Sequence, residues 1–421
     1  MSAGIQLRST LSQAVLAESN EQQLVYVLLE LSAQGVPTSL PKLPLNLCLV
    51  IDRSSSMKGE RLLQVKEAAQ RVVDMLGDDD YFSLVTFNDR ADVVVSAQRA
   101  RNKTDIKRMI GSIEAAGGTE MATGMALALQ ETQRPMLTRG ISRMLLLTDG
   151  RTYGDESRCV EIVRRAQGRG IGLTALGIGN EWNEDLLETM AARENSRTQY
   201  ITSAKEIAQI FTDEVKRMHS IFAQDVQLRT EVRPGAMLRS LDRVRPFLAT
   251  LPALEEKELC WVANMGDWPG GDAQAFLLEV VVPALQVGDH PLLRLTLNYN
   301  LPAMNLHNQK GDLVLRIGVR PADKVAYEVD ATVRHWLERL VAYRLQAGAW
   351  QAVEEGKIEE ATRRLQMAGT RLFEAGEVDL ARTVQEEATR LLRSGNTSAE
   401  GRKRIKYGTR GLMGLGQEPE A

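Results

Sequence analysis

Apolar and polar residues are arranged in three different ways along the chain, and each pattern predicts a different kind of structure. Between residues 44 and 220, apolar runs of strand length alternate with stretches in which apolar residues recur at helical spacing. Between residues 221 and 320, apolar and polar positions alternate, as in Leu293–Tyr299. From Pro321 onward only helical spacing continues. The sequence therefore predicts an α/β unit, then an antiparallel sheet, then a helical segment.

The α/β unit is predicted to contain a parallel sheet that is covered by helices on both faces. Its first strand, Leu45–Ile51, is a continuous apolar run, which is typical of a strand buried on both sides. Met144–Leu147 and Ile171–Gly177 predict further strands of this kind, while Tyr81–Phe87 and Ala91–Ser96 flank a hairpin connection. We therefore expect a Rossmann-like, doubly wound sheet with one antiparallel edge strand.

Two strands are predicted before the α/β unit, at Ile5–Thr10 and Gln23–Leu31. They have no partner in the parallel sheet, so we expect them to pair with the antiparallel strands of residues 221–320. Those later strands alternate apolar and polar residues, which predicts one buried and one solvated face. This pairing makes the α/β unit, residues 44–220, an insertion within a β-sandwich formed by residues 1–43 and 221–320.

Residues 321–394 are predicted to form a helical bundle segment. Asp323–Trp350 carries apolar residues at helical spacing and is predicted to be one long helix. Two further helices, each with one apolar face, are predicted over Ile358–Leu372 and Leu380–Leu391. The link Ala375–Glu377 between them is short, so they are expected to be antiparallel neighbours.

Residues 395–421 are predicted to form a disordered basic tail, because they are rich in glycine and charge and poor in large apolar residues. Within this tail, Arg402–Arg410 is compactly basic. One interpretation is a solvated, flexible chain end. The other is a docking segment in which phosphorylated Thr409 binds a phosphothreonine-reading partner.

Composition and charge narrow the classes of partner. The 421 residues carry a formal net charge of −3 and only 5% aromatic residues, so nothing favours general attraction to nucleic acid or to a membrane. The N-terminal sequence lacks a signal-peptide pattern, and no apolar run approaches the roughly 20 residues of a membrane helix. Cys48, Cys159 and Cys260 are far apart in sequence and are expected to be reduced thiols. We therefore expect a cytoplasmic protein with no nucleic-acid or membrane partner.

Hydroxyl and carboxylate side chains occur at three places around the predicted strand ends. Asp52, Ser54 and Ser56 come directly after the first buried strand, and Asp149 comes after a second apolar run. Thr119 lies in a loop behind two glycines. Because ligands of open α/β sheets collect at the carboxyl ends of the strands, these oxygens are expected to share one rim. Oxygen donors favour hard cations, and Mg²⁺ accepts a few protein oxygens while it keeps waters.

This set of two carboxylates and three hydroxyls, on three loops in this order, resembles the metal-ion-dependent adhesion site of the von Willebrand factor A family. The chain resembles that family over roughly residues 44–220, and its layout is similar to that of bacterial members and of inter-alpha-inhibitor heavy-chain-like proteins. The resemblance implies Mg²⁺ as the cofactor, with Mn²⁺ and Ca²⁺ as alternatives. In the family the two serines bind the cation directly, the aspartates often act through waters, and the threonine joins when ligand is bound. The implied metal-site residues are Asp52, Ser54, Ser56, Thr119 and Asp149.

The resemblance also implies a non-enzymatic protein-binding or adaptor module, in which an Asp or Glu of a partner protein completes the coordination of the metal. One alternative is a regulatory or substrate-adaptor subunit of an AAA+ ATPase complex. Another is a metal-dependent hydrolase, which the sequence disfavours because it offers no general base beyond the metal ligands. Ser55 stands where many relatives carry glycine, and an intact motif that no longer binds metal is the remaining alternative.

Overall fold

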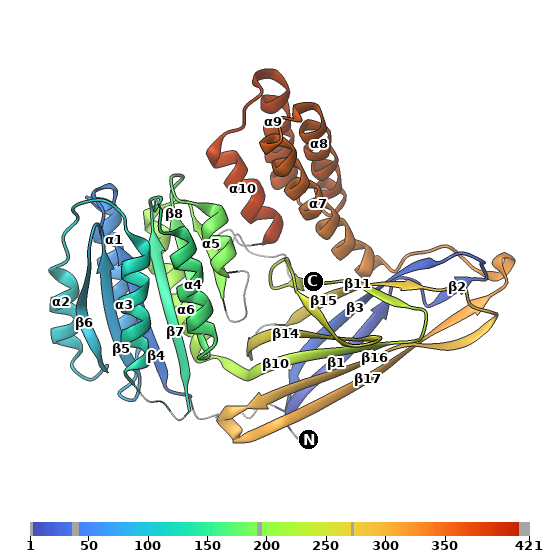
Figure 1. Cartoon of the computed structure of the whole chain (residues 1–421), viewed down its shortest axis with the longest axis horizontal. Coiled ribbons are helices and arrows are strands. Elements are labelled where there is room, and N and C mark those ends of the chain that lie inside the picture. The colour runs from blue at the N-terminus through green and yellow to red at the C-terminus, as the bar shows by residue number, and fades with distance from the viewer. Residues whose placement is uncertain are drawn as a thin grey trace. The chain divides into compact units, whose positions relative to one another are not determined.

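The chain folds into two compact units (Figure 1). The computed structural model describes residues 3–35, 42–135, 137, 139–152, 154–191, 196–270 and 273–411. One unit comprises the described residues between 42 and 221, and the other combines residues 3–35 with those from 222 to 411. The predicted fold class is confirmed, since an α/β unit is inserted between strands of a β-sandwich and helices follow the sandwich.

The α/β unit is built on a mostly parallel sheet. Within the described residues its strand order is β6–β5–β4–β7–β8–β9. These strands are β4 (Leu45–Asp52), β5 (Tyr81–Phe87), β6 (Ala91–Arg99), β7 (Ile141–Thr148), β8 (Ile171–Ile178) and β9 (Arg197–Ile201). All neighbours are parallel except β5 and β6, which form the predicted edge hairpin. Every residue of β4 and β8 is buried, as their largely apolar sequences predict.

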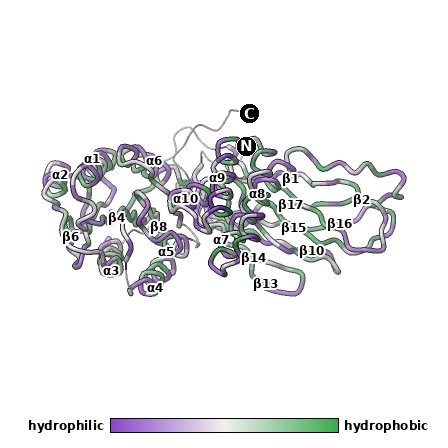
Figure 2. The backbone as a smooth tube through the Cα atoms, turned by 90° about the horizontal axis from the view of Figure 1, so that it is seen from above, coloured by the Kyte–Doolittle hydropathy of each residue, from purple (hydrophilic) through white to green (hydrophobic). Residues whose placement is uncertain are grey.

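Helices cover both faces of this sheet, with α1 and α6 on one side and α3 and α4 on the other (Figure 2). The helices of the unit are α1 (Glu60–Met75), α2 (Lys103–Gly111), α3 (Met121–Gln133), α4 (Glu156–Gln167), α5 (Glu184–Ala191) and α6 (Ile207–His219). On α1 the residues Leu62, Val65, Ala69 and Val72 are buried, which confirms the predicted helical spacing. A sheet covered on both faces leaves its strand ends as the place where polar side chains reach solvent.

Asp80, in the turn before β5, joins three elements of the α/β unit. Its side chain accepts hydrogen bonds from the backbone amides of Leu45 and Gly77, both at 2.7 Å. His219 Nε2, at the end of α6, lies 3.1 Å from Asp80 Oδ2. Although burial raises the pKa of the Asp80 carboxyl, the hydrogen bonds from His219 and the two amides outweigh it, and the pKa lies below its usual value. The fold therefore stabilises the ionised form of Asp80.

Replacing Asp80 with asparagine is expected to destabilise the α/β unit by about 2 kcal/mol at neutral pH, because an amide nitrogen cannot accept these hydrogen bonds. The folded-state pKa is lowered, so the stabilisation is complete above the unfolded pKa of about 3.9 and is lost as the pH falls through the folded value. Urea unfolding at about pH 7 and about pH 3 measures both effects. We expect the gap between wild type and Asp80→Asn to shrink in acid. Asp78→Asn, in the same turn and exposed, is the control, and an equal loss in that variant would contradict the account.

The second unit begins with a β-sandwich of two sheets. Across the first sheet the strands are β1 (Gly4–Leu11), β3 (Gln23–Gln34), β15 (Gln274–Val282), β11 (Met237–Arg245) and β12 (Ala249–Thr250). Across the second sheet they are β13 (Ala253–Lys257), β14 (Cys260–Pro269), β10 (Ile221–Val232), β16 (Gly288–Leu301), β17 (Leu306–Arg320) and β2 (Val15–Ala17). β3 pairs with both β1 and β15, which confirms that the early strands join the later sheet.

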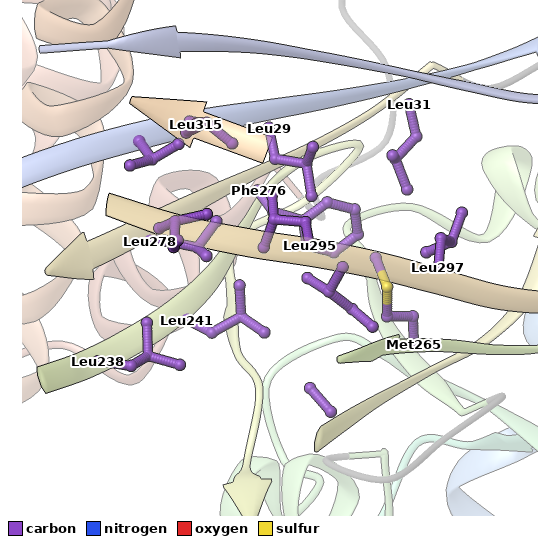
Figure 3. Close-up of a cluster of buried hydrophobic side chains, with 14 of the residues drawn as sticks. Leu29, Leu31, Leu238, Leu241, Met265, Phe276, Leu278, Leu295, Leu297 and Leu315 are labelled. Atoms are coloured by element: carbon purple, nitrogen blue, oxygen red, sulfur yellow. The ribbon is translucent and has the colours of Figure 1, made fainter. Parts of the chain in front are cut away.

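The apolar core of the sandwich lies between its two sheets (Figure 3). Leu29 and Phe276 enter this core from the first sheet, and Leu295 and Leu315 enter it from the second. On β16 the residues between the buried ones are polar and accessible, as at Arg294. The predicted solvated face is therefore confirmed for β16.

The outer face of the first sheet is covered by α7 (Ala331–Glu354). Val333 and Leu340 of α7 are buried together with Leu28 and Leu277 of the sheet. β15 and the centre of β3 are thus buried on both faces, which explains their almost continuously apolar sequences. The expectation of one solvated face is wrong for this sheet, since a helix takes the place of solvent.

Three more helices pack with α7. They are α8 (Ile358–Glu374), α9 (Val378–Ser394) and α10 (Ala399–Arg410). α8 and α9 lie side by side and bury the apolar faces that the sequence predicts (Figure 1). The predicted start of α7 is wrong, because residues 325–330 are not helical. Asp330 caps the helix instead: its carboxylate accepts the amides of Thr332 and Val333 at 2.9 and 3.1 Å.

The predicted disorder of residues 395–421 is wrong for the part that the structure describes. Residues 399–410 form α10, and Ile405 and Tyr407 are completely buried. Ile405 joins the apolar core that the other helices share. The prediction of disorder rests on the mean composition of residues 395–421. A helix that completes an existing core needs only a few apolar contacts, and the mean composition does not reveal them. Residues 412–421 of the predicted tail lie outside the described residues.

Local contacts explain where α10 begins. The Ser398 hydroxyl caps the helix by accepting the amide of Gly401 at 2.9 Å. Glu387 on α9 accepts hydrogen bonds from both the amide and the hydroxyl of Ser398. Gly401 permits this close approach, since a Cβ at that position would overlap Glu387. One carboxylate on α9 therefore fixes the start of the following helix.

Thr409 is 2% exposed and its hydroxyl donates a hydrogen bond to the carbonyl of Lys406 at 3.2 Å. A buried hydroxyl is not available to a kinase or to a phosphothreonine-reading partner, so that prediction is wrong for the folded chain. The end of α10 is also fixed, because the amide of Leu248 donates to the carbonyl of Arg410 at 2.9 Å. The basic segment is therefore part of the fold.

Two expectations from composition bear on the described residues. Cys48, Cys159 and Cys260 are free and buried, which agrees with the predicted structural thiols. None of the described helices combines the length and the apolar content that a membrane span requires.

Candidate metal centre

The candidate site lies where the neighbouring strands β4 and β7 both end. From β4 the chain continues to β5 on one side, whereas β7 lies on the other side, so the strand order reverses here. Asp52 is the last residue of β4, and Asp149 directly follows β7. The two strands are parallel, with Ile51 opposite Leu147. Both carboxylates therefore reach the same rim, at the point where open α/β sheets bind ligands.

Asp52 is completely buried and is held by two hydrogen bonds. Its Oδ1 accepts the amide of Ser54 at 2.8 Å, and its Oδ2 accepts the hydroxyl of Thr148 at 2.7 Å. Burial raises the pKa of Asp52 to about 6 against the effect of these hydrogen bonds, and the charge of Asp149 adds to the rise. A positive charge at this rim would offset the unfavourable burial of the two carboxylates.

Ser54, Ser56 and Asp149 are connected by hydrogen bonds. The Oγ atoms of Ser54 and Ser56 are 3.0 Å apart, and Ser56 Oγ donates to Asp149 Oδ1 at 2.7 Å. The short 3₁₀ turn Ser55–Met57 brings the two serines together, and the buried side chain of Met57 anchors the turn. Each hydroxyl oxygen has two lone pairs, so the serines can offer oxygen to a cation while they keep these contacts.

Ser55 connects the loop after β4 to the glycine loop. Its amide and its hydroxyl both donate to the carbonyl of Gly117, each at 3.0 Å. Gly117 has a φ of +80°, and a Cβ there would overlap Asp89 in the β5–β6 turn. Asp89 also accepts the amide of Gly118 at 2.9 Å. Ser55 therefore adds a side-chain hydrogen bond that a glycine cannot make.

Thr119 follows these glycines and borders the same rim. A Cβ built on Gly150 would lie 3.4 Å from Thr119 Oγ1 and 4.0 Å from Ser56 Oγ. The two hydroxyls therefore face a small space that glycine leaves open next to Asp149. The structure thus brings all five predicted residues to one rim of the sheet.

The donor set suits a hard divalent cation. Its atoms are the oxygens of two buried carboxylates and of hydroxyl groups, which hard cations prefer. The carboxylates supply negative charge, and the space beside Gly150 is bordered by hydroxyl oxygen. In the part of the chain that the structure describes, no group of three or more His, Cys, Asp or Glu side chains is placed to hold a metal ion. The residues that could hold the cation are Asp52, Ser54, Ser56, Thr119 and Asp149.

Arg61, in the first turn of α1, is a residue of the site that the sequence does not predict. Its Nη1 donates to Asp149 Oδ2 at 2.6 Å and to the carbonyl of Ser56 at 3.4 Å. The side chain of Asp149 is fully buried, whereas that of Arg61 is 43% exposed. No sequence pattern marks Arg61, because a charged residue in the first turn of an amphipathic helix is ordinary.

Two family models match separate parts of the chain. The von Willebrand factor type A domain matches residues 46–213, which include the candidate site. The Sll0103-like, C-terminal alpha-helical domain matches residues 331–415, which include α7 to α10. The β-sandwich lies outside both matches.

One relative and one solved structure match most of the chain, and a second relative matches a smaller part of it. The uncharacterized protein sll0103 of Synechocystis is 30% identical over 364 residues, and the match covers 86% of each chain. The inter-alpha-trypsin inhibitor heavy chain H4 of Bos taurus is 32% identical over 166 residues, which are 37% of this chain and 18% of that protein. A solved structure of a von Willebrand factor type A protein from Catenulispora acidiphila covers 97% of both chains, with a TM-score of 0.77 at 20% identity. That likeness shows the fold of nearly the whole chain.

Proposed function

Because the chain belongs to the Sll0103-like family of von Willebrand factor type A proteins, we propose that it is a non-enzymatic adaptor that captures an acidic side chain of a partner protein through a divalent cation. Von Willebrand factor type A domains commonly bind proteins. The observation that carries the proposal is the convergence of Ser54, Ser56 and Asp149 in one hydrogen-bonded cluster at the ends of β4 and β7.

Each residue of the cluster has a distinct task in this proposal. Ser54 and Ser56 present neutral oxygens to the cation, and the loop that holds them is fixed by Met57 and Ser55. Asp52 orients the first serine by accepting its amide, and its charge compensates the cation at short range. When bound, a divalent cation with neutral hydroxyl ligands supplies an electrophilic position that a carboxylate of the partner can take.

The cation is expected to be Mg²⁺, since the site offers a few protein oxygens and Mg²⁺ binds through a few such ligands while it keeps waters, with Mn²⁺ and Ca²⁺ as alternatives. The helices α7 to α10 and the sandwich contribute folded surface outside the site. The proposal includes no catalytic step, because the cluster contains no titratable side chain beyond its own carboxylates and Arg61.

Metal-dependent capture from a lysate of the source cells tests this proposal. Immobilised wild-type protein in Mg²⁺ is expected to retain a set of proteins that an EDTA wash releases and that Ser54→Ala fails to retain. Ser54→Ala removes one hydroxyl and leaves the buried carboxylates, so circular dichroism is expected to show an intact fold. Asp92→Asn is the matched control, since Asp92 is exposed and pairs only with Arg53 among the contacts described.

The result that would contradict the proposal is retention of the same proteins by wild type in Mg²⁺, by wild type in EDTA and by Ser54→Ala. Partners retained under all three conditions would bind elsewhere on the molecule, and the cluster would have no role in their capture.

A further inference from the structure

The carboxylate of Asp149 already has a cationic partner within the chain. Ser56 donates to its Oδ1, and the guanidinium of Arg61 donates to its Oδ2 at 2.6 Å. An ion pair this short, with one fully buried member, largely neutralises the carboxylate. A divalent cation that approaches the Ser54–Ser56 pair therefore meets two different carboxylates. The charge of Asp149 is offset by Arg61, whereas the hydrogen bonds described for Asp52 come from neutral groups.

We propose that Arg61 is a resident counter-cation that competes with the divalent cation for Asp149. The inference rests on the proposed function, because it concerns the same cation. In the absence of metal, Arg61 compensates the charge of Asp149 through its short ion pair. A divalent cation that binds Asp149 must displace this guanidinium, so the ion pair lowers the affinity of the site for the metal.

The surroundings of Arg61 allow it to leave Asp149. Its side chain is 43% exposed, and its hydrogen-bond partners among the described residues are Asp149 and the carbonyl of Ser56. Gly179, after β8, makes room for the guanidinium, since a Cβ there would lie 3.3 Å from Arg61 Nη2. The side chain can therefore turn to solvent when a cation takes its place.

The competition predicts a gain in metal affinity when the charge of Arg61 is removed. Arg61→Gln is expected to bind Mn²⁺ roughly tenfold more tightly than wild type. The expected gain is smaller than for a fully buried charge pair, because Arg61 is partly exposed and solvent screens its charge. Electron paramagnetic resonance of free Mn²⁺ measures the affinity directly. Arg61→Lys keeps the charge and is expected to stay near wild type. Arg71→Gln, an exposed arginine further along α1, is the matched control for net charge.

A second measurement does not depend on metal binding. In EDTA, Arg61→Gln is expected to unfold at lower urea concentration than wild type, because buried Asp149 loses its ionic partner. Excess Mn²⁺ is expected to close this gap, since the cation then compensates Asp149 in both proteins.

The outcomes separate this inference from the proposed function. If wild type binds Mn²⁺ and Arg61→Gln binds it equally or more weakly, the competition is overturned while the metal site stands. Equal tightening by Arg71→Gln, or by Arg61→Lys, also overturns it. If neither wild type nor Arg61→Gln binds Mn²⁺, the proposed function fails and the inference fails with it. Binding by Arg61→Gln alone supports the competition, with Arg61 as the stronger competitor, but overturns the proposed function, because the wild-type site then holds no cation.

Discussion

Replacing Asp149 with alanine is expected to weaken the binding of Mn²⁺ on the order of 100-fold. Asp149 is one of two carboxylates at the rim, and it also accepts a hydrogen bond from the hydroxyl of Ser56. The substitution removes a buried negative charge, frees the guanidinium of Arg61 to repel the cation, and releases Ser56 from its fixed orientation. These effects act in the same direction, so this variant has the largest expected effect on the site.

Titration with Mn²⁺ under electron paramagnetic resonance measures this loss, and thermal unfolding in EDTA shows whether the fold is intact. The matched control is Asp92→Asn, which also removes one carboxylate charge but does so at an exposed position. An affinity of Asp149→Ala within a few-fold of wild type would show that the cation, if it binds, does so without the predicted carboxylate.

Replacing Arg344 with methionine is expected to destabilise the unit of sandwich and helices by about 3 kcal/mol. Arg344 on α7 donates to Asp242 Oδ2 at 2.8 Å and to Glu279 Oε2 at 3.0 Å. Those carboxylates are 1% and 6% exposed, so loss of the guanidinium leaves buried negative charge without its main partner. Arg239 still pairs with Glu279, which limits the loss. Methionine keeps the aliphatic stem, so the variant isolates the charge and its donors.

Urea unfolding followed by circular dichroism measures this effect. The matched control is Arg334→Met on the same helix, because Arg334 is exposed and donates to the carbonyl of Val329. A surface change of that kind is expected to alter stability by less than about 0.5 kcal/mol. Equal midpoints for Arg344→Met and wild type would contradict the claim that Arg344 stabilises this unit by pairing with the two buried carboxylates.

The parts of the fold that the sequence predicts are those with strong local patterns. The continuous apolar runs of β4 and β8 encode burial on both faces, and Asp52 and Asp149 are recognisable because each directly follows such a run. The sequence does not predict β9, because Tyr200 and Ile201 are its only large apolar residues. It predicts the start of α7 too early, although Asp330 is a favourable capping residue, because the apolar residues before Asp330 continue the helical spacing.

The parts that the sequence does not predict depend on tertiary partners. Thr148 and Arg61 contribute to the site through contacts with residues far away in the sequence. Thr148 contacts Asp52, 96 positions away, and Arg61 contacts Asp149, 88 positions away. α10 is ordered because Glu387 and the apolar core of α7 to α9 receive it, which its own composition does not show. The AAA+ ATPase alternative and the cytoplasmic location stay predictions, because no contact of the described residues bears on them.

Anomalous diffraction from crystals grown with Mn²⁺ tests the central claim most directly, because it locates the cation itself. The account predicts one peak at the ends of β4 and β7, within about 2.2 Å of the hydroxyl oxygens of Ser54 and Ser56, as for a directly bound hard cation. In that structure Arg61 is expected to have left Asp149. No peak at this rim in crystals saturated with Mn²⁺, or a peak bound by other residues, would contradict the account.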